Sequence, residues 1–323
     1  MRDLQGTDRC GIVLAAGEGR RLQPLIRQWR GDDLPKQYVP FTGERSLLEQ
    51  ALQRAERLIP PGQIFTIIDR KHLRFQEVWQ QLAGRSRGTV IFQPQNKETG
   101  PGILLPLLHA YKHFPEATVA IFPSDHYVRE EGLFSDHVDL AFRLVAEEPS
   151  RLILLGMRPT GPETEYGYLL PGEALPKLAP SGARQVTRFI EKPTPLVAAE
   201  LLRQGGLWNT MILVAKVARL WELSRAAAPE LTGQMEKLLQ ILGTSGEEAA
   251  AEALYREIPS VNFSKALLER FPQIDLNALA VLPVRGVYWS DWGSIQRVMG
   301  DLRAIGSFNT VGAMKEEEHL VAR

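Results

Sequence analysis

The segment Leu14–Leu22 is the first part of the sequence whose residue types suggest chemistry. It reads Leu-Ala-Ala-Gly-Glu-Gly-Arg-Arg-Leu and ends an apolar, β-branched run. Gly17 and Gly19 would let backbone N–H groups come close to phosphate oxygens, and Arg20 and Arg21 would add charged, forked donors. The alternative is a tight turn that carries two solvated arginines, because a lone glycine-rich loop is a weak signal.

Two better-known phosphate loops do not fit this segment. It lacks the Gly-Lys-Ser/Thr ending of a P-loop, and it has no third glycine where a dinucleotide fingerprint needs one. The tripeptide Pro35-Lys36-Gln37 follows shortly afterwards. The ammonium group of Lys36 is a compact point charge suited to a phosphate. An isolated lysine would only be a solvated surface residue. Lys36 is a candidate phosphate contact because the glycine loop is close to it in the sequence.

The elements that must position these residues follow an α/β pattern. Short apolar runs predict strands in the first half at Gly11–Ala15, Ile64–Asp69, Thr89–Gln93, Thr118–Pro123 and Arg151–Met157. Amphipathic stretches separate them, and the clearest is Ser46–Ile59, where Ser46 and Glu49 form a capping box. This alternation favours a Rossmann-like, mixed but mainly parallel sheet flanked by helices. Open sheets of this kind bind ligands at the carboxyl ends of their strands.

The second half is less regular. Strands are predicted at Gly167–Leu170, Gln185–Glu191, Met211–Val214 and Leu279–Val284. Helices are predicted at Pro195–Arg203, Val217–Ala227, Leu231–Leu242, Glu247–Glu257 and Phe263–Arg270, with a last one after Trp292. No long linker divides the chain, so we expect one domain over 1–306, with halves of about 8–160 and 161–306. The segment 26–34 suggests an expanded polar loop, and 307–323 a flexible tail.

Composition excludes several classes of protein. The 323 residues include 38 basic and 38 acidic ones, so nothing in the balance suggests a nucleic-acid or membrane partner. The single cysteine, Cys10, rules out an intrachain disulfide and a Cys-rich zinc site. The polar N-terminus lacks the apolar core of a signal peptide, and no run reaches the roughly 18–20 residues of a membrane span. We expect a cytoplasmic enzyme acting on small molecules, with a homo-oligomer left open.

The glycine loop and Pro-Lys together resemble the sugar-nucleotide pyrophosphorylases, whose signature is Leu-Ala-Gly-Gly-x-Gly-Thr-Arg-Leu followed by Pro-Lys. Later segments are similar to further motifs of that family in the same order: Phe122-Pro123-Ser124-Asp125-His126, Glu165-Tyr166-Gly167-Tyr168, Phe189-Ile190-Glu191-Lys192-Pro193, Trp208-Asn209-Thr210-Met211 and Trp289-Ser290-Asp291-Trp292-Gly293-Ser294. The ordered set covers about Gly11 to Ile295. Each motif is weak alone, and the order makes the resemblance specific.

Within that family the chain looks most like the mannose-1-phosphate guanylyltransferases. Pro-Lys-Gln, the Trp-Ser-Asp-x-Gly segment and the loop Gln93–Gly102 carry this likeness, the last being similar to Glu-Pro-x-x-Arg-Asn-Thr-Ala-Pro-Ala. The resemblance implies a glycosyltransferase-A-like nucleotidyltransferase fold. It also implies a reaction in which a sugar 1-phosphate attacks the α-phosphorus of a nucleoside triphosphate, most of all mannose 1-phosphate and GTP. Pyrophosphate would leave, and an NDP-sugar would form.

Roles for individual residues come with the resemblance. Catalysis would consist of positioning and charge neutralisation. Asp125 and Asp291 would bind Mg²⁺, which prefers oxygen ligands and usually takes one or two carboxylates. Arg21 would stabilise the triphosphate, and Lys36 would bridge the two reacting phosphates. Each aspartate could instead be a helix N-cap.

The remaining site residues fall into two groups. The nucleotide would contact the loop residues Ala15, Ala16, Gly17 and Gly19, and the base would contact Asn96 and Thr99. The sugar phosphate would contact Gly167, Glu191, Lys192 and Asn209, although Glu191 and Lys192 could be an ordinary surface ion pair.

The sequence also departs from the family pattern. Ala16 stands where the loop has Gly, Arg20 where it has Thr, and Lys97 and Glu98 where it has Arg and Asn. Glu165 replaces a Gly, and Ser264 an Asp. These changes leave base and sugar identity open. A different base or sugar, a cytidylyltransferase of the isoprenoid-precursor type and a non-catalytic sugar-nucleotide sensor therefore remain as alternatives.

Two further features concern metals and appended domains. His109 and His113 have the four-residue spacing of metal ligands on a helix, but surface histidines are the better interpretation because no third ligand is evident nearby. Only 32 residues follow Asp291. We therefore expect neither the left-handed β-helix nor the fused isomerase domain that some members of the family carry.

Overall fold

A nine-stranded mixed sheet forms the centre of the protein in the computed structural model, which describes residues 8–86 and 88–306. The predicted tail 307–323 lies outside the described residues. The strand order is β3-β2-β1-β4-β9-β6-β10-β8-β7. The strands are β1 Arg9–Ala15, β2 Ile64–Asp69, β3 Val90–Gln93, β4 Thr118–Pro123, β6 Leu152–Met157, β7 Gly167–Ala174, β8 Arg184–Glu191, β9 Leu207–Lys216 and β10 Leu279–Val284. The predicted mixed α/β fold is confirmed.

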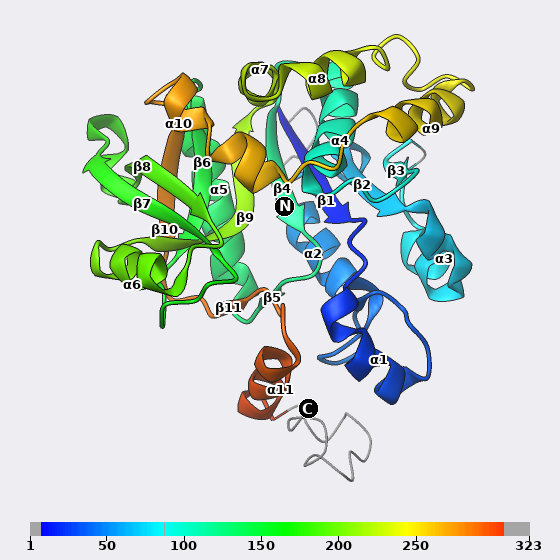
Figure 1. Cartoon of the computed structure of the whole chain (residues 1–323), viewed down its shortest axis with the longest axis horizontal. Helices are drawn as coiled ribbons and strands as arrows, with labels where there is room; N and C mark the ends of the chain where they lie inside the picture. Colours follow the sequence, from blue (N-terminus) through cyan, green and yellow to red (C-terminus); the bar gives the residue numbers. More distant parts are fainter. Residues whose placement is uncertain (1–7, 87, 307–323) are drawn as a thin grey trace.

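Strand direction explains where a ligand can bind. Every antiparallel pairing in this sheet involves β8 or β9, while β3, β2, β1 and β4 are mutually parallel. The last residues of these four strands therefore lie at one edge of the sheet. Figure 1 shows β3 at one end of the sheet and β7 and β8 at the other. The glycine loop leaves from the end of β1, in the middle of the parallel group.

The two predicted halves of the chain share this sheet. Strand β9 from the second half lies between β4 and β6 of the first half, and it pairs antiparallel with both. Strand β10, also from the second half, pairs parallel with β6 on the other side. The halves are thus interleaved at the centre of the sheet.

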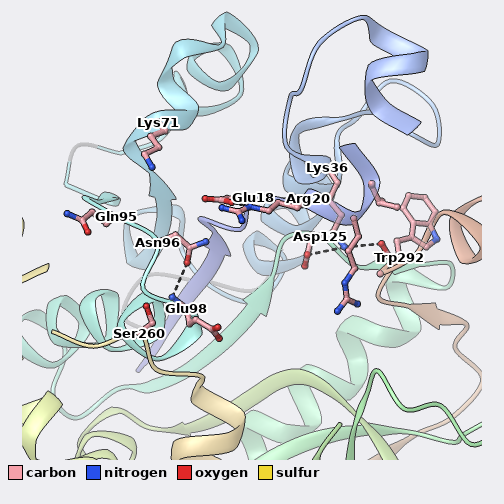
Figure 2. A pocket seen from close by; sticks show the side chains of 14 residues that line it. Glu18, Arg20, Lys36, Lys71, Gln95, Asn96, Glu98, Asp125, Ser260 and Trp292 are labelled. Carbon is pink, nitrogen blue, oxygen red and sulfur yellow. Dashed lines mark hydrogen bonds and ion pairs between the residues drawn. The ribbon is translucent and has the colours of Figure 1, made fainter. Parts of the chain in front are cut away.

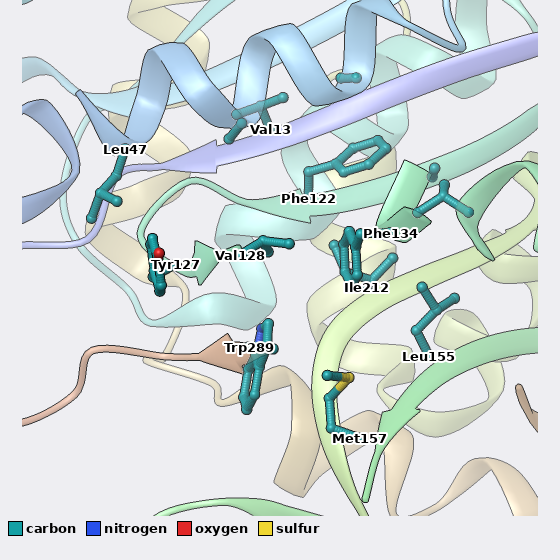
Figure 3. Close-up of a cluster of buried hydrophobic side chains, with 14 of the residues drawn as sticks. Val13, Leu47, Phe122, Tyr127, Val128, Phe134, Leu155, Met157, Ile212 and Trp289 are labelled. Atoms are coloured by element: carbon teal, nitrogen blue, oxygen red, sulfur yellow. The ribbon is translucent and has the colours of Figure 1, made fainter. Parts of the chain in front are cut away.

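Alternate residues of the central strands enter two separate cores. Val13 and Phe122 belong to one core, and Ile12 and Ile121 belong to the other, as the period of two along a strand requires. Figure 3 shows part of the first core, where Val13 and Phe122 lie with Phe134, Leu155 and Ile212. Helices α2 Leu47–Glu56 and α5 Glu131–Glu147 cover that face, and α4 Thr99–His113, α7 Val217–Ala227, α8 Pro229–Glu236 and α9 Glu247–Glu257 cover the other.

A two-stranded ribbon, which the sequence did not predict, joins two distant segments. Strand β5 Tyr127–Val128 pairs antiparallel with β11 Trp289–Ser290. The ribbon begins two residues after Asp125 and ends one residue before Asp291. It therefore brings together two aspartates that lie far apart in the sequence.

Most predicted elements are confirmed, with shifts at their ends. The structure contains the capping box at Ser46 and Glu49. Strand β9 begins at Leu207, so Asn209 lies within a strand. The predicted helix over 231–242 is α8 with a run of turns, and that over 263–270 is a π-helical turn, Ser264–Leu268, followed by α10 Phe271–Ile274. The last helix is α11, Ile295–Ala304.

The prediction of a polar loop over 26–34 is wrong. Residues Gln23–Arg30 form helix α1, and Gly31 ends it in the left-handed conformation with φ 83°. Pro24 at the first turn and Gly31 at the end are favourable positions for those residues. Only Leu25 and Ile26 are buried in this short helix, so its apolar pattern is too brief to stand out from the sequence. Figure 1 shows α1 and α11 at the bottom of the view, on the side toward which β1 points.

Candidate active site

A cavity of about 750 Å³ opens at the carboxyl edge of the parallel strands. Figure 2 shows residues from the glycine loop near its middle, Lys36 and Asp125 on one side, and Asn96, Glu98 and Ser260 on the other. The lining residues are Glu18, Gly19, Arg20, Arg21, Leu22, Lys36, Lys71, Gln95, Asn96, Glu98, Asp125, Ser260, Trp292 and Gly293. Five residues that the sequence analysis assigned to the site thus line one cavity: Gly19, Arg21, Lys36, Asn96 and Asp125.

Contacts from Lys36 and Gln37 hold the glycine loop in shape. Gly19 has φ 61°, and a Cβ there would lie 3.1 Å from the backbone nitrogen of Lys36, so glycine allows the two segments to touch. The Gln37 side chain donates from Nε2 to the carbonyls of Ala15 at 2.8 Å and Gly17 at 2.7 Å. A Cβ on Gly17 would meet no atom within 4 Å, which leaves that side open to a ligand.

Tyr38 also contacts the end of β1. The Tyr38 hydroxyl donates to the Ala15 carbonyl at 3.1 Å and also lies 3.1 Å from His72 Nδ1. The Gln37 and Tyr38 side chains are both buried. Sequence analysis assigned a role only to the lysine of this segment, although Gln37 stood in the same motif.

Lys36 links the cavity to the two segments that flank one end of the β5–β11 ribbon. Its Nζ donates to the carbonyl oxygens of Asp291 at 2.8 Å and Trp292 at 3.1 Å, and it lies 3.1 Å from Asp125 Oδ2. Lys36 is only 6% exposed. Its three N–H donors therefore have three acceptors inside the protein, which fixes its position and balances its charge.

The charge of Asp125 depends on Lys36. Burial acts against ionisation of this carboxyl, but the Lys36 ammonium outweighs it, so the pKa of Asp125 lies below its ordinary value. His126 Nε2 lies 3.6 Å from Asp125 Oδ1. Burial lowers the pKa of His126 despite the nearby carboxylate. At neutral pH the site thus holds an ionised Asp125 beside a neutral imidazole.

Asp291 is oriented by residues to which the sequence analysis assigned no role. Its Oδ1 accepts hydrogen bonds from the Tyr166 hydroxyl at 3.0 Å, from the Gly293 N–H at 2.9 Å and from the Arg297 guanidinium. Arg297 also contacts the Tyr166 hydroxyl. These hydrogen bonds all use Oδ1, and Asp291 is not among the lining residues of the cavity. The Asp291 carboxylate is thus oriented through Oδ1, while the backbone carbonyl of the same residue accepts from Lys36.

The two arginines of the loop differ in their partners. Arg20 pairs with Glu18 of the same loop, and its side chain is 79% exposed. Arg21 pairs with Glu165, at an N–O distance of 2.5 Å, and its side chain is 58% exposed. Glu165 lies just before β7, in the second half of the chain. Arg21 therefore reaches the second half of the chain, whereas Arg20 remains within its own loop.

Three of the predicted sugar-phosphate residues form a cluster on the neighbouring strands β7, β8 and β9. Gly167 pairs with Glu191 between β7 and β8, and a Cβ on Gly167 would lie 2.7 Å from Glu191 Oε2 and 3.5 Å from the Cβ of Asn209. Burial raises the pKa of Glu191, although Lys192 opposes this. Lys192 itself is exposed. None of the four is a lining residue of the cavity described above.

Only one of the two predicted base contacts lines the cavity. Asn96 lines the cavity, and its Oδ1 accepts a hydrogen bond from the Glu98 N–H at 2.9 Å. Thr99 is not a lining residue, and its hydroxyl accepts a hydrogen bond from the Phe263 N–H at 2.9 Å. The lining residues Lys71, Gln95, Glu98 and Ser260 were not assigned from the sequence. Two of them could have been found from their position in the sequence, because Lys71 and Gln95 each follow a parallel strand.

The predicted surface position of His109 is wrong, while His113 is exposed as expected. His109 is 5% exposed, and its Nε2 lies 2.9 Å from Glu247 Oε1. Within residues 8–86 and 88–306, no group of three or more His, Cys, Asp or Glu side chains could hold a metal ion. In the same part of the chain, no helix is long and apolar enough to cross a membrane.

Comparison with known proteins agrees with this geometry. The family described as nucleotidyl transferase matches residues 10–303. The chain belongs to the nucleotidyl transferase family. Because the match extends over most of the chain, the predicted family is confirmed, and the matched range contains every residue of the cavity.

Individual members of the nucleotidyl transferase family show moderate similarity. The xanthan biosynthesis protein XanB of Xanthomonas campestris pv. campestris (strain B100) is 29% identical over 290 residues, covering 89% of this chain and 58% of that protein. A mannose-1-phosphate guanylyltransferase of Klebsiella pneumoniae is 25% identical over 285 residues, which are 88% of this chain and 58% of the relative. This chain thus spans less than two thirds of the length of these relatives.

A crystal structure described as mannose-1-phosphate geranyltransferase, from Thermus thermophilus, is similar in fold. Its TM-score is 0.75 at 28% identity, and the match covers 91% of this chain and 79% of that one. A UDP-glucose pyrophosphorylase in complex with UDP-glucose has a TM-score of 0.55 at 14% identity. This second likeness supports the fold alone.

Proposed function

We propose that this protein forms an NDP-sugar and pyrophosphate from a nucleoside triphosphate and a sugar 1-phosphate, with GTP and mannose 1-phosphate as substrates and GDP-mannose as product. The arrangement around Lys36 carries the proposal, because it places a buried ammonium group between the glycine loop and two aspartates. The guanylyltransferase named among the relatives supports the choice of base and sugar.

The chemistry requires positioned charge more than a reactive side chain. A sugar 1-phosphate oxygen is already a nucleophile, so the bond to the α-phosphorus forms as the bond to pyrophosphate breaks. The glycine loop and Arg21 would hold the triphosphate, and Lys36 would face the phosphate that reacts. For Lys36 to bind that phosphate directly, a phosphate oxygen would replace the Asp125 carboxylate as its third acceptor.

The residues present fit Mg²⁺. The Lys36 ammonium contacts both the Asp125 carboxylate and the backbone of Asp291, so the two aspartates lie near the same group. The hydrogen bonds to the Asp291 carboxylate leave its Oδ2 for another partner. One or two carboxylates, with phosphates and water, are the usual protein share of a magnesium site. We propose that Asp125 and Asp291 hold the ion, which would neutralise charge on the phosphate oxygens.

A substrate panel tests the proposed function. Four nucleoside triphosphates are crossed with mannose, glucose and related 1-phosphates in the presence of Mg²⁺, and pyrophosphate release is measured. We expect the fastest release with GTP and mannose 1-phosphate. Tight binding of an NDP-sugar without turnover of any pair would contradict the proposal and would favour a sensor.

Replacing the loop arginines separately should distinguish them. Arg21→Ala is expected to lower kcat/KM by about tenfold or more, because a charge-assisted hydrogen bond contributes about 1.5–3 kcal/mol. Arg20→Ala should lower it by less than about threefold, because Arg20 is largely solvated and paired within its own loop. Initial rates over a range of GTP concentrations provide the measurement, and equal losses for the two variants would count against the role of Arg21.

The magnesium assignment predicts a change in metal requirement. Asp125→Asn and Asp291→Asn should each raise the Mg²⁺ concentration for half-maximal activity by at least about tenfold, since even outer partners of a metal site contribute about that much to affinity. Asp136→Asn, on the exposed side of α5, is the matched control. Full activity of both site variants at low Mg²⁺ would show that the ion is held elsewhere.

A further inference from the structure

Glu98 has a backbone conformation that is nearly reserved for glycine. Its φ is 66° and its ψ is −173°. A residue with a Cβ in this region carries strain of about 1–3 kcal/mol, and such strain persists only where the surroundings hold it. Glu98 lines the cavity directly before α4. The strain therefore lies in the wall of the proposed nucleotide site.

The neighbouring segments hold Glu98 in place by backbone pairing. The Val261 N–H donates to the Lys97 carbonyl at 3.0 Å, and the Gly100 N–H donates to the Val261 carbonyl at 2.7 Å. The Thr99 hydroxyl accepts a hydrogen bond from the Phe263 N–H. The loop before α4 is thus hydrogen-bonded on both sides of Glu98, which fixes the backbone of this residue.

The carboxylate of Glu98 has a defined orientation and one free side. The Asn262 Nδ2 donates to Oε2 at 3.3 Å, so the hydrogen bond from Asn262 leaves Oε1 for another donor. Figure 2 shows Glu98 beside Asn96 and Ser260, away from Lys36 and Asp125. If the triphosphate lies against the glycine loop, Lys36 and Asp125, this wall faces the base.

The chemistry of a carboxylate selects among bases. An ionised carboxylate only accepts hydrogen bonds, and its two oxygens suit two donors that lie side by side. Guanine presents N1–H and N2–H₂ next to each other on one edge, whereas adenine, cytosine and uracil place an acceptor beside their donor on that edge. We propose that Glu98 is the residue that selects guanine, by accepting hydrogen bonds from its N1–H and N2–H₂ groups.

This inference rests on the proposed function, and an experiment with the inosine nucleotide ITP tests the two separately. ITP differs from GTP only in lacking the 2-amino group. We expect the protein to prefer GTP over ITP by about tenfold or more in kcat/KM, as expected for a charge-assisted hydrogen bond. In Glu98→Gln this preference should fall to about threefold or less, mainly through slower use of GTP. Glu98→Gly should do the same while accepting the positive φ more readily.

Glu18→Gln is the matched control, because Glu18 is a carboxylate of the same cavity within the phosphate loop. It should change GTP and ITP use by the same factor. An unchanged GTP-to-ITP ratio in Glu98→Gln and Glu98→Gly, with normal turnover of GTP, would overturn the inference and leave the proposed function standing. If no triphosphate reacts, the proposed function fails, and the ratio of GTP and ITP dissociation constants in the same variants tests Glu98 directly.

Discussion

Lys36→Met is expected to lower kcat/KM for NDP-sugar formation by about 10³-fold, at the upper end of the effect of removing one preorganised charged donor. The ammonium group of Lys36 is buried and contacts both the Asp125 carboxylate and the carbonyls that follow the β5–β11 ribbon. Methionine fills similar space but leaves the Asp125 carboxylate without its main partner. The loss should therefore appear in kcat as well as in KM.

The measurement is a comparison of kcat and KM for both substrates, with thermal unfolding as a check on folding. Lys112→Met is the control. Lys112 also donates to a backbone carbonyl, that of Leu242 at 2.7 Å, but it lies outside the cavity. It should keep kcat within about twofold, as surface changes usually do. A Lys36→Met protein that is folded and fully active would refute the central role given to this lysine.

Trp292→Ala should lower the free energy of unfolding by about 3–5 kcal/mol, the range for truncating a buried tryptophan. Trp292 is fully buried and stacks on Tyr127 with ring centroids 4.9 Å apart, and it meets the Phe41 ring edge-on at 5.2 Å. Its Nε1 donates to Asp301 Oδ2 at 2.8 Å. The loss combines a cavity in the core with an unpaired Asp301 oxygen.

Urea unfolding followed by circular dichroism gives this free energy. Trp292→Phe should cost clearly less than the alanine variant, because it keeps much of the ring packing and loses only the Nε1 donor. Trp79→Ala is the control, since Trp79 is 54% exposed, and it should cost less than about 1 kcal/mol. Equal losses at positions 79 and 292 would show that the packing of Trp292 contributes little.

The Trp292 position also links stability to the site. Its carbonyl accepts a hydrogen bond from Lys36, and its side chain anchors the segment that follows Asp291. A partial loss of packing there would let the Asp291 and Trp292 carbonyls move away from Lys36. We therefore expect Trp292 variants that still fold to lose activity as well, although Trp292 contributes no charge to the reaction.

Local patterns in the sequence determined most of the sheet and its phosphate loop. The strands β2, β4 and β10 have the predicted bounds, because buried strands of six residues produce a clear apolar run. The capping box at Ser46 is a local hydrogen-bond pattern, so it could also be predicted from the sequence. The position of Lys36 near the glycine loop followed from the short stretch between them.

Only the tertiary structure decided how the second half of the chain completes the site. The β5–β11 ribbon has two residues in each strand, too few to show a period, yet it determines where Asp125 and Asp291 meet. Helix α1 was missed because only two of its side chains are buried. The burial of His109 depends on Glu247, far along the chain. A local pattern reports which face of an element is apolar, whereas pairing between distant segments leaves no periodic signal in either segment.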